Sequence, residues 1–530
     1  MKDYTKRQKI LIILGVSLFI LIGSGLTYAA LTWATSNPIN IGLTSGCFEI
    51  NYTPGGAINN ANVEVMNEST LINGSKFTIT DGIALTYANI GIKSTCTIEG
   101  YGSLYLNVTS LSSAFTTGSS KGSLKYAILN NTSSSTTLTV TGLKGQSFDI
   151  VKTGTITSTG TINILNKKLS NTSQNKYLIV FYIDGSKIGN DVVGASFNGN
   201  ISADAHQGKV PYEGLAKLIA NDTFKSTKTV TLNNVNYKYD DTHKLMEDTA
   251  GNIRYYGASP NNYIYFNCSD YSNQTSSTCE TWRIIGVFDG NVKIMRGSVI
   301  GSYSWDTSDS STNSGWGVNE WSQADLMKLL NSGYDSESVG GSLYWNAKSG
   351  MCYNNKNNTT TSCNFISTGL KNDTTRNMIA ETTYYTRGHG SSSIYVDAMY
   401  DKERVSGTVK TGVTPTRTLT WTGKIAVAYP SDYGYAADLS LCQKQLGYYN
   451  DATCIANNWM ENILRTSSYG WLLTPGSSYA NEAWYVYSTG SVGFTYVSIA
   501  RGVAPVLSLT SELDIGPGSG TSSSPYQLSV

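Results

Sequence analysis

The stretch Thr281–Arg296, TWRIIGVFDGNVKIMR, decides how the second half of this chain is expected to fold. Two apolar runs rich in Ile and Val flank Asp289-Gly290, a dipeptide typical of the tight turn of a β-hairpin. Such residues pack well on a pleated sheet surface. The stretch therefore predicts an antiparallel hairpin.

Around this hairpin, from about residue 245 to residue 530, the pattern predicts one large α+β domain. Ser322 and Asp325 have the spacing of a capping box at the start of a helix. A buried strand leading into a loop is expected over residues 424–436. Helices are expected over residues 322–334, 373–388 and 457–465, and closing strands over residues 471–476, 483–499 and 502–509.

The residue pattern in the first half of the chain predicts strands and turns. Its apolar segments alternate with polar residues or run continuously, and they are rich in Thr, Ile, Val and Tyr. No long segment has helical periodicity, so residues 36–205 predict an antiparallel β-sandwich. The strands are expected over residues 76–80, 137–143, 153–165 and 176–185.

Residues 206–244 are more basic and less patterned than the segments on either side. They are expected to be a connector, with one short helix over residues 214–222. The chain thus divides into a leader (1–34), a β-sandwich domain (36–205), a connector (206–244) and an α+β domain (245–530).

The charge balance argues against two classes of protein. The 530 residues include 38 Lys and Arg against 37 Asp and Glu, and charged residues make up 14% of the chain, where roughly 25% is usual. A nucleic-acid-binding protein needs a basic surface to displace counterions from phosphates. A disordered chain of the charge-rich kind is also disfavoured.

The N-terminus has the features of an export leader. Lys2, Lys6, Arg7 and Lys9 precede an uncharged apolar run over residues 10–22, and small residues follow. This order describes a signal peptide; the alternative is an uncleaved anchor over residues 10–34. In both cases the basic end stays in the cytoplasm and the rest is exported. An extracellular or cell-surface location is expected, with membrane contact through residues 10–34 only if the leader is uncleaved.

An even number of cysteines in an exported chain predicts disulfides. Sequential pairing is the simplest arrangement, because six of the eight form three close pairs around polar loops. A metal site is disfavoured, since no Cys-x-x-Cys occurs and His206, His243 and His389 are scattered. The expected pairs are Cys47–Cys96, Cys268–Cys279, Cys352–Cys363 and Cys442–Cys454.

Four C-terminal segments carry a resemblance to a known fold: Trp471–Pro475, Ala483–Tyr487, Gly490–Val492 and Gly502–Leu507. They are similar to the W-L-R-S-P, Ser/Gly-hairpin and G-V-R-P-x-L pattern of a bacterial surface domain. That domain resembles the C-type-lectin-like fold shared with formylglycine-generating-enzyme-type domains and with variable proteins of diversity-generating retroelements.

The resemblance covers about residues 255–509 and implies a C-type-lectin-like α+β domain. Leu473 and Ala504 stand where the family pattern has arginine. A site that depends on those arginines in relatives is therefore in doubt in this chain. The spacing of the cysteines is more typical of disulfides that close structural loops than of the reactive pair that formylglycine-generating activity requires.

The first domain resembles the fibre-forming, TasA/camelysin-like biofilm proteins. The segment TYAALTW after the apolar run and the segment FYIDGSKIGNDVVGASFNGNISADA (residues 181–205) carry this resemblance. It implies a processed leader and a domain that can assemble into fibres.

An aromatic hairpin near the C-terminus is the candidate ligand-binding site. On a strand, Tyr485 and Tyr487 share one face while Trp484 and Val486 share the other. Tyr and Trp supply large contact areas at low entropic cost, which suits recognition surfaces. The alternative is ordinary cross-strand pairing within a sheet. The candidate binding residues are Trp484, Tyr485, Tyr487, Phe494, Tyr496 and Arg501.

Other constellations are weaker. Asp306, Asp309, Glu320 and Asp325 are oxygen donors of the kind that bind calcium, but no D-x-D-x-D-G loop is present, and solvated or helix-capping carboxylates are the stronger interpretation. No metal site or other cofactor is expected.

For catalysis, His389 and Asp397 lie near many serines, yet a Ser-His-Asp set is defined by geometry, and no nucleophile elbow occurs. No catalytic residue is therefore assigned.

These observations lead to one function and two alternatives. The leading hypothesis is an exported bacterial surface protein that binds a glycan or another surface protein through its C-terminal domain. The first alternative is a structural fibre or biofilm-matrix component that self-assembles through exposed edge strands of the β-sandwich. The second is an extracellular enzyme, which remains the least favoured.

Overall fold

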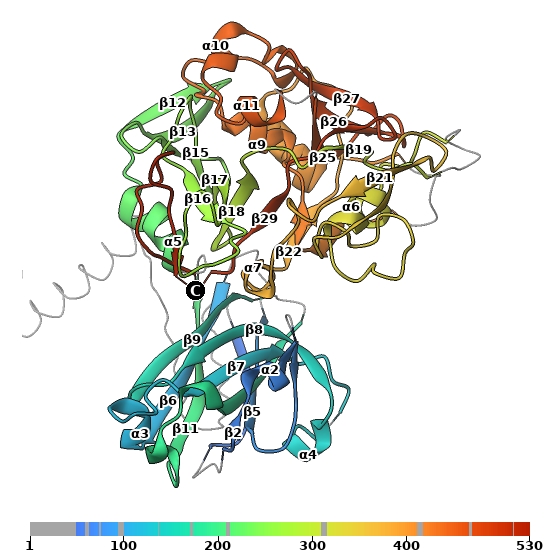
Figure 1. Ribbon diagram of the computed structural model, residues 1–530. Helices are drawn as coiled ribbons and strands as arrows, with labels where there is room; N and C mark the ends of the chain where they lie inside the picture. Colours follow the sequence, from blue (N-terminus) through green and yellow to red (C-terminus); the bar gives the residue numbers. More distant parts are fainter. Residues whose placement is uncertain are drawn as a thin grey trace, which may run out of the picture. The chain divides into compact units, whose positions relative to one another are not determined.

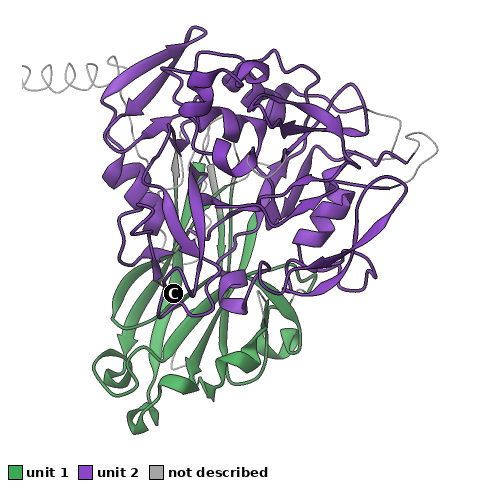
Figure 2. Ribbon diagram, turned by 45° about the horizontal axis from the view of Figure 1, so that its top comes forward, with its two compact units in different colours: residues 1–210 green, residues 211–530 purple. Residues whose placement is uncertain are grey.

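The computed structural model describes residues 49–58, 63–73, 76–93, 100–135, 137–169, 173–207, 213–308, 315–410, 417–465, 469–511 and 513–529. The chain divides into two compact units, residues 1–210 and residues 211–530 (Figure 2). Antiparallel strands predominate in both, and each α-helix of the described residues has six residues or fewer. The β-rich, multidomain organisation expected from the sequence is confirmed.

Unit 1 contains two sheets. The larger has eight strands, in the order β1-β5-β10-β7-β8-β4-β3 with β2 paired to β10, and the smaller has the order β11-β6-β9 (Figure 1). The strands are β1 (Glu49–Pro54), β2 (Val65–Met66), β3 (Ile72–Asn73), β4 (Lys76–Thr78), β5 (Ala84–Lys93), β6 (Gly100–Leu111), β7 (Leu124–Asn130), β8 (Ser147–Thr155), β9 (Gly160–Lys168), β10 (Asn175–Asp184) and β11 (Phe197–Gln207).

The two sheets of unit 1 share one apolar core. Ile90 of β5, Leu106 of β6 and Phe197 of β11 belong to the same buried cluster. Alternate residues of β10, such as Leu178 and Tyr182, enter a second cluster on the opposite face of the larger sheet. Because successive side chains of a strand point to opposite faces, burial of both faces accounts for the continuous apolar run in β10.

Short helices cover parts of unit 1. They are α2 (Glu68–Leu71), α3 (Ser113–Thr116) and α4 (Val140–Leu143). The strand expected over residues 137–143 is wrong, because its second half is helix α4. The Thr139 hydroxyl oxygen accepts a hydrogen bond from the Gly142 backbone N–H at 3.2 Å. A threonine that satisfies a free helix N–H in this way favours a helix start over a strand.

Unit 2 is built around a nine-stranded sheet. Its order is β12-β13-β14-β15-β17-β18-β29-β24, with β16 paired to β17. The strands are β12 (Lys228–Leu232), β13 (Val235–Asp240), β14 (Leu245–Glu247), β15 (Ile253–Tyr255), β16 (Tyr263–Phe266), β17 (Glu280–Phe288), β18 (Asn291–Arg296), β24 (Ile425–Ala426) and β29 (Val506–Ser508).

The predicted hairpin is confirmed as β17 and β18, near the middle of this sheet. Phe288 pairs with Asn291 on either side of the turn. Asp289 and Gly290 have φ angles of 49° and 87°, and positive φ angles at both central residues are typical of the type I′ turn, whose twist matches that of the strands. Ile284 enters one buried cluster and Ile285 another. The hairpin is therefore covered on both faces.

The segment expected to be a connector contributes to this sheet. β12 and β13 lie within residues 206–244 and pair with each other and then with β14. Tyr237 and Tyr239 of β13 are buried in a cluster with Tyr435. Residues 213–244 belong to unit 2, because alternate apolar residues of the two short strands pack in its core. The short helix expected over residues 214–222 is confirmed by α5 (Gly214–Lys217) and the following turn of π-helix, η3 (Leu218–Thr223).

A five-stranded sheet carries the C-terminal segments. Its order is β19-β28-β25-β26-β27, and β19, β25, β26 and β27 lie close together in Figure 1. The strands are β19 (Ser302–Tyr303), β25 (Gly470–Pro475), β26 (Glu482–Val486), β27 (Val492–Tyr496) and β28 (Arg501–Gly502). Three two-stranded sheets complete the unit: β20 (Ser349–Tyr353) with β21 (Thr360–Asn364), β22 (Thr382–Tyr385) with β23 (Thr420–Gly423), and β30 (Asp514–Ile515) with β31 (Leu528–Ser529).

The helices of unit 2 are shorter than the sequence predicts. The helix expected over residues 373–388 ends at Asn377, and β22 occupies Thr382–Tyr385, where Thr and Tyr favour a strand. The helix expected over residues 457–465 forms over only four residues. The helices are α6 (Asp325–Leu330), α7 (Asp373–Asn377), α8 (Val396–Asp401), α9 (Pro430–Tyr435), α10 (Ala452–Ala456) and α11 (Glu461–Leu464).

Two local details also differ. The capping box expected at Ser322 is wrong, since Ala324 is the N-cap residue of α6 and the Ser322 hydroxyl donates to Glu320. The loop expected after the strand at residue 425 is instead helix α9, in which Pro430 occupies the first turn, where proline is well tolerated.

The predicted leader, residues 1–34, lies outside the described residues. Within the part that is described, no helix is both long and apolar enough to cross a membrane.

Candidate functional site

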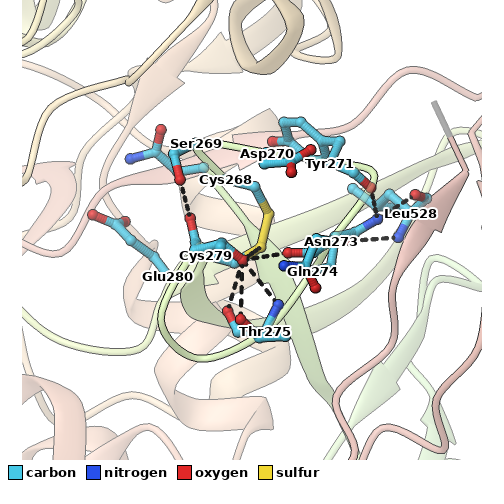
Figure 3. Close-up of a disulfide and its surroundings, with 12 residues drawn as sticks. Cys268, Ser269, Asp270, Tyr271, Asn273, Gln274, Thr275, Cys279, Glu280 and Leu528 are labelled. Carbon is cyan, nitrogen blue, oxygen red and sulfur yellow. Dashed lines mark hydrogen bonds between the residues drawn. A yellow bond between two sulfur atoms is a disulfide. The ribbon is translucent and has the colours of Figure 1, made fainter.

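Disulfides hold three loops of unit 2. Cys268 is bonded to Cys279, Cys352 to Cys363 and Cys442 to Cys454, as sequential pairing predicts. The predicted Cys47–Cys96 pair lies outside the described residues. In the first loop, Gln274 exchanges two hydrogen bonds with the Leu528 backbone, at 2.7 and 3.0 Å, which ties the loop to β31 (Figure 3). Disulfide bonds form and persist in an oxidising environment.

The candidate aromatic hairpin is formed by β26 and β27. Trp484 is 0% exposed and its indole N–H donates to the His389 carbonyl at 2.9 Å. Its ring contacts Phe494, with 5.7 Å between ring centroids. The partly buried Phe494 packs against the same core cluster. Trp484 therefore serves the core, which leaves no surface for a ligand.

Tyr485 is also largely buried, at 5% exposure, but it belongs to a cluster that reaches the surface. Its ring lies 4.3 Å from that of Tyr487 and 5.9 Å from that of Tyr469. The Arg501 guanidinium carbon is 4.5 Å from the Tyr469 ring centroid and 5.3 Å from that of Tyr485. We call Tyr469, Tyr485, Tyr487 and Arg501 the tyrosine–arginine cluster; all except Tyr485 are partly exposed.

The Tyr487 ring has room because of a glycine on the opposing strand. A Cβ atom at Gly493 would lie 2.7 Å from a ring carbon of Tyr487. Any larger residue there would push the ring away from its partners. The cluster thus depends on a small residue that pairs with Tyr485 across the sheet.

Tyr496, at the end of β27, is the most exposed of the predicted binding aromatics, at 40%. Its ring lies 4.5 Å from that of Trp316 at an interplanar angle of 30°. The Lys356 ammonium is 4.7 Å from the centroid of the Trp316 ring. We call these three residues the tryptophan–lysine cluster. Two aromatic rings in contact beside a cation suit contact with polar ligands that also have flat apolar faces.

The protonation state of Tyr485 is set by its burial. Burial raises the pKa of Tyr485 far above its usual range, and its hydrogen bond with Tyr487 and the charge of that neighbour raise it further. Tyr485 therefore stays neutral at physiological pH. The arrangement can offer ring faces, hydroxyl groups and the Arg501 charge to a ligand.

Sequence reasoning missed three members of these clusters. Tyr469 precedes β25 with a φ angle of 68°, and Trp316 and Lys356 lie in loops. Only tertiary packing brings them to the hairpin. The one signal available in the sequence was compositional, since Tyr469 and Gly470 precede Trp471 and glycines flank Trp316 on both sides.

Two of the four candidate calcium carboxylates come together. Asp306 accepts a hydrogen bond from the Asp325 backbone N–H, at 3.4 Å, and Asp325 accepts from Thr307 at 2.7 and 2.8 Å. Burial raises the pKa of Asp325 to about 6, and the charge of Asp306 raises it as well. Burial likewise raises the pKa of Asp306. A negative charge on Asp306 therefore disfavours ionisation of the Asp325 carboxyl group.

The other two carboxylates do not join this pair. Glu320 is bound by Arg417 at 3.1 Å and by the Thr418 hydroxyl at 2.8 Å. Asp309 lies outside the described residues. Among the residues that are described, no group of three or more His, Cys, Asp and Glu side chains has the geometry to hold a metal ion.

The candidate catalytic residues are not brought together. The His389 ring stacks beside Trp484, at 6.4 Å and 17°, and burial lowers its pKa. Asp397 has one carboxylate oxygen that is buried without a hydrogen bond. In the described parts of the chain, no hydrogen bond or ion pair joins His389 to Asp397.

A buried charge network in unit 2 was not foreseen. Arg254 donates to Asp248 at 2.6 Å and to Asp432 at 2.9 Å, and Lys293 also pairs with Asp432. Burial alone would raise the pKa of Asp432, but Lys293 and Arg254 lower it overall. Burial lowers the pKa of Lys293 to about 8. These charges satisfy one another, which indicates a structural role around α9.

A search with models of known protein families finds none that matches this chain, and a search of curated proteins finds no significant match.

Proposed function

We propose that this chain is an exported bacterial surface protein that binds a glycan or a surface protein through the β26–β27 hairpin of unit 2. The observation that carries this proposal is the exposure of Tyr496 in the tryptophan–lysine cluster, at the end of the same hairpin that carries Tyr487. Aromatic rings that face water leave apolar surface unburied, which is unfavourable. We therefore expect this exposed pair of rings to contact a ligand.

The setting of the protein supports export. Three disulfides in unit 2 require an oxidising environment. The basic and apolar pattern of residues 1–34 supplies a route across the membrane as a signal peptide or an anchor. The proposed location is extracellular, on or near the cell surface.

The proposed fold assignment is a β-sandwich followed by a C-type-lectin-like domain. Two sheets with a shared core support the first part. For the second, β25 and β26 cover most of two segments of the family pattern, and β27 and β29 overlap the ends of the other two. In this proposal unit 1 acts as a stalk or assembly module and unit 2 presents the ligand-binding face.

The ligand is proposed to be neutral and polar rather than an acidic polymer. The whole chain has a formal net charge of +1, so it lacks the excess of cations that attracts polyanions. Ring faces and hydroxyl groups of the two clusters suit sugar rings or a protein surface rich in aromatic and polar side chains.

Glycan arrays and pull-downs with the full-length protein test this proposal. Tyr487→Ala and Tyr496→Ala are each expected to weaken binding of the captured ligand at least tenfold. Tyr385→Ala is the matched control, because Tyr385 is 38% exposed but lies on β22, which belongs to a separate two-stranded sheet. Binding that survives both hairpin variants, or no ligand in either assay, would refute the proposal.

A second candidate function rests on one edge strand of unit 1. In the described residues, β9 pairs with β6 alone, so it is an edge strand of the three-stranded sheet. Such an edge can accept a strand from another copy. Regular filaments of the secreted protein in electron micrographs would support assembly through unit 1, and monodisperse particles would contradict it.

A further inference from the structure

A pocket of about 420 Å³ opens in unit 2 between strands β16, β17 and β18 and helix α11. Its volume falls in the range of roughly 300–1,000 Å³ that is usual for ligand sites. It shares no residue with the two aromatic clusters. The residues that line it are Tyr263, Glu280, Thr281, Arg283, Arg296, Gly297, Ser298, Trp459, Asn462 and Ile463.

Arg283 is the buried cation of this pocket. Its side chain is 7% exposed, and its Nε donates to the Asn262 side chain at 2.6 Å. The guanidinium carbon lies 3.7 Å from the centroid of the Tyr263 ring and 4.9 Å from that of Trp459. The two rings fix the guanidinium in place at the pocket wall.

Among the described residues, no carboxylate balances the charge of Arg283. Its Nη2 is buried and makes no hydrogen bond, and in the described residues no carboxylate forms an ion pair with it. The nearby Glu280 is engaged by Arg296, at 2.9 and 3.1 Å. Counting these three side chains, the pocket retains one positive charge. Burial lowers the pKa of Arg283 to about 10, which agrees with an uncompensated cation.

The rim of the pocket is polar. Thr281 and Ser298 are exposed and offer hydroxyl groups. The Ser298 hydroxyl oxygen accepts from Arg296 at 2.8 Å, so its own O–H is oriented by the pocket wall. Groups of this kind recognise a ligand with several hydroxyls better than an apolar one.

We propose that this pocket binds an acidic sugar residue, whose carboxylate pairs with Arg283 and whose hydroxyls contact the polar rim. One buried cation matches one carboxylate, since Arg and carboxylate form strong charge-assisted hydrogen bonds. A single site of this kind needs no basic surface patch, so it is compatible with the near-neutral charge of the chain. The proposal is independent of ligand binding by the aromatic hairpin.

Isothermal titration calorimetry of the full-length protein at neutral pH tests the ligand class. The probes are D-glucuronate, N-acetylneuraminate, D-glucose and inorganic phosphate. At least one sugar acid is expected to bind ten times more tightly than D-glucose and phosphate. Binding of neither sugar acid, equal binding of D-glucose, or equal binding of phosphate would overturn the proposal.

Variants test the role of the pocket itself. Arg283→Gln and Ser298→Trp are each expected to weaken sugar-acid binding at least tenfold, the first by removing the charge and the second by filling the mouth from an exposed position. Lys238→Gln is the matched control, because it removes one exposed positive charge from β13. Should Arg283→Gln fail to fold, unchanged binding by Ser298→Trp would still contradict the proposal.

Discussion

At the scale of single residues, Trp484 and Tyr496 show that neighbouring aromatics of one hairpin serve different ends. Trp484 is fully buried and bonded to the His389 carbonyl, whereas Tyr496 is 40% exposed. Both satisfied the same compositional criterion for a binding residue. Only burial separates the residue that stabilises the core from the one available to a ligand.

Trp484→Ala is expected to lower the free energy of unfolding by about 3–5 kcal/mol, because it leaves a large cavity in a packed core. Tyr496→Ala is expected to change it by less than about 1 kcal/mol, as is usual for exposed positions. Urea unfolding of the full-length variants measures both values. A cost below about 1 kcal/mol for Trp484→Ala would contradict its placement in the core.

Asp325 gives a pH dependence of stability. Its pKa in the folded protein is about 6, whereas an aspartate in an unfolded chain has a pKa of about 3.9. The folded state therefore holds this proton more tightly. The resulting stabilisation is fully present below about pH 4 and is lost as the pH rises through about 6.

Asp325→Asn removes this titration and retains an oxygen that can accept from Thr307. The melting temperature of the unaltered protein is expected to fall more between pH 5 and pH 7 than that of the variant. Differential scanning calorimetry at the two pH values measures the difference. Parallel changes in the two proteins would show that the Asp325 carboxyl does not titrate as the geometry predicts.

At the scale of elements, the central hairpin of unit 2 depends on close approach of three strands. Gly286 of β17 pairs with Arg254 of β15 on one side and with Lys293 of β18 on the other. A Cβ atom at this position would lie 2.2 Å from the Ile253 carbonyl oxygen. The strand can therefore keep its two neighbours only with glycine here.

Gly286→Ala is expected to destabilise the protein by about 1–3 kcal/mol, since the added methyl group forces the strand backbones apart. Gly516→Ala is the control, because a Cβ there would meet its nearest neighbour at an ordinary 3.5 Å. Chemical denaturation compares the two variants. An equal and small effect of both would contradict the close approach of β15 and β17.

Prediction of individual elements from the sequence succeeded where the local signal was strong. The β17–β18 hairpin and strand β10 follow from turn residues and apolar runs. It failed where several structures suited the same residues. The apolar spacing of residues 373–388 fits a helix, but β-sheet pairing between Tyr384 and Trp421 prevails in the second half.

At the scale of the whole molecule, disulfides link the stability of unit 2 to its chemical surroundings. The three disulfides of the described residues all lie in unit 2. Each closes a short loop, and each is expected to contribute about 3 kcal/mol by restricting the unfolded chain. The stability of unit 2 is therefore linked to the redox state of its surroundings.

Alkylation of the native, non-reduced protein, followed by mass spectrometry, is expected to modify none of the six cysteines of unit 2. After mild reduction the calorimetric transition of unit 2 is expected to move to lower temperature. Reactive thiols at these six positions in protein recovered from the cell exterior would contradict the oxidising setting, and with it the proposed location.

The sequence by itself determined the class of structure, the local disulfide pairs and the central hairpin, because each depends on residues that are close along the chain. Tertiary structure alone decided which aromatics are buried and that Trp316 and Lys356 join Tyr496. It also decided that Arg283 lines a pocket in which no described carboxylate pairs with it. Those features join residues that are distant along the chain. Burial and charge balance there depend on packing between elements, which local pattern does not encode.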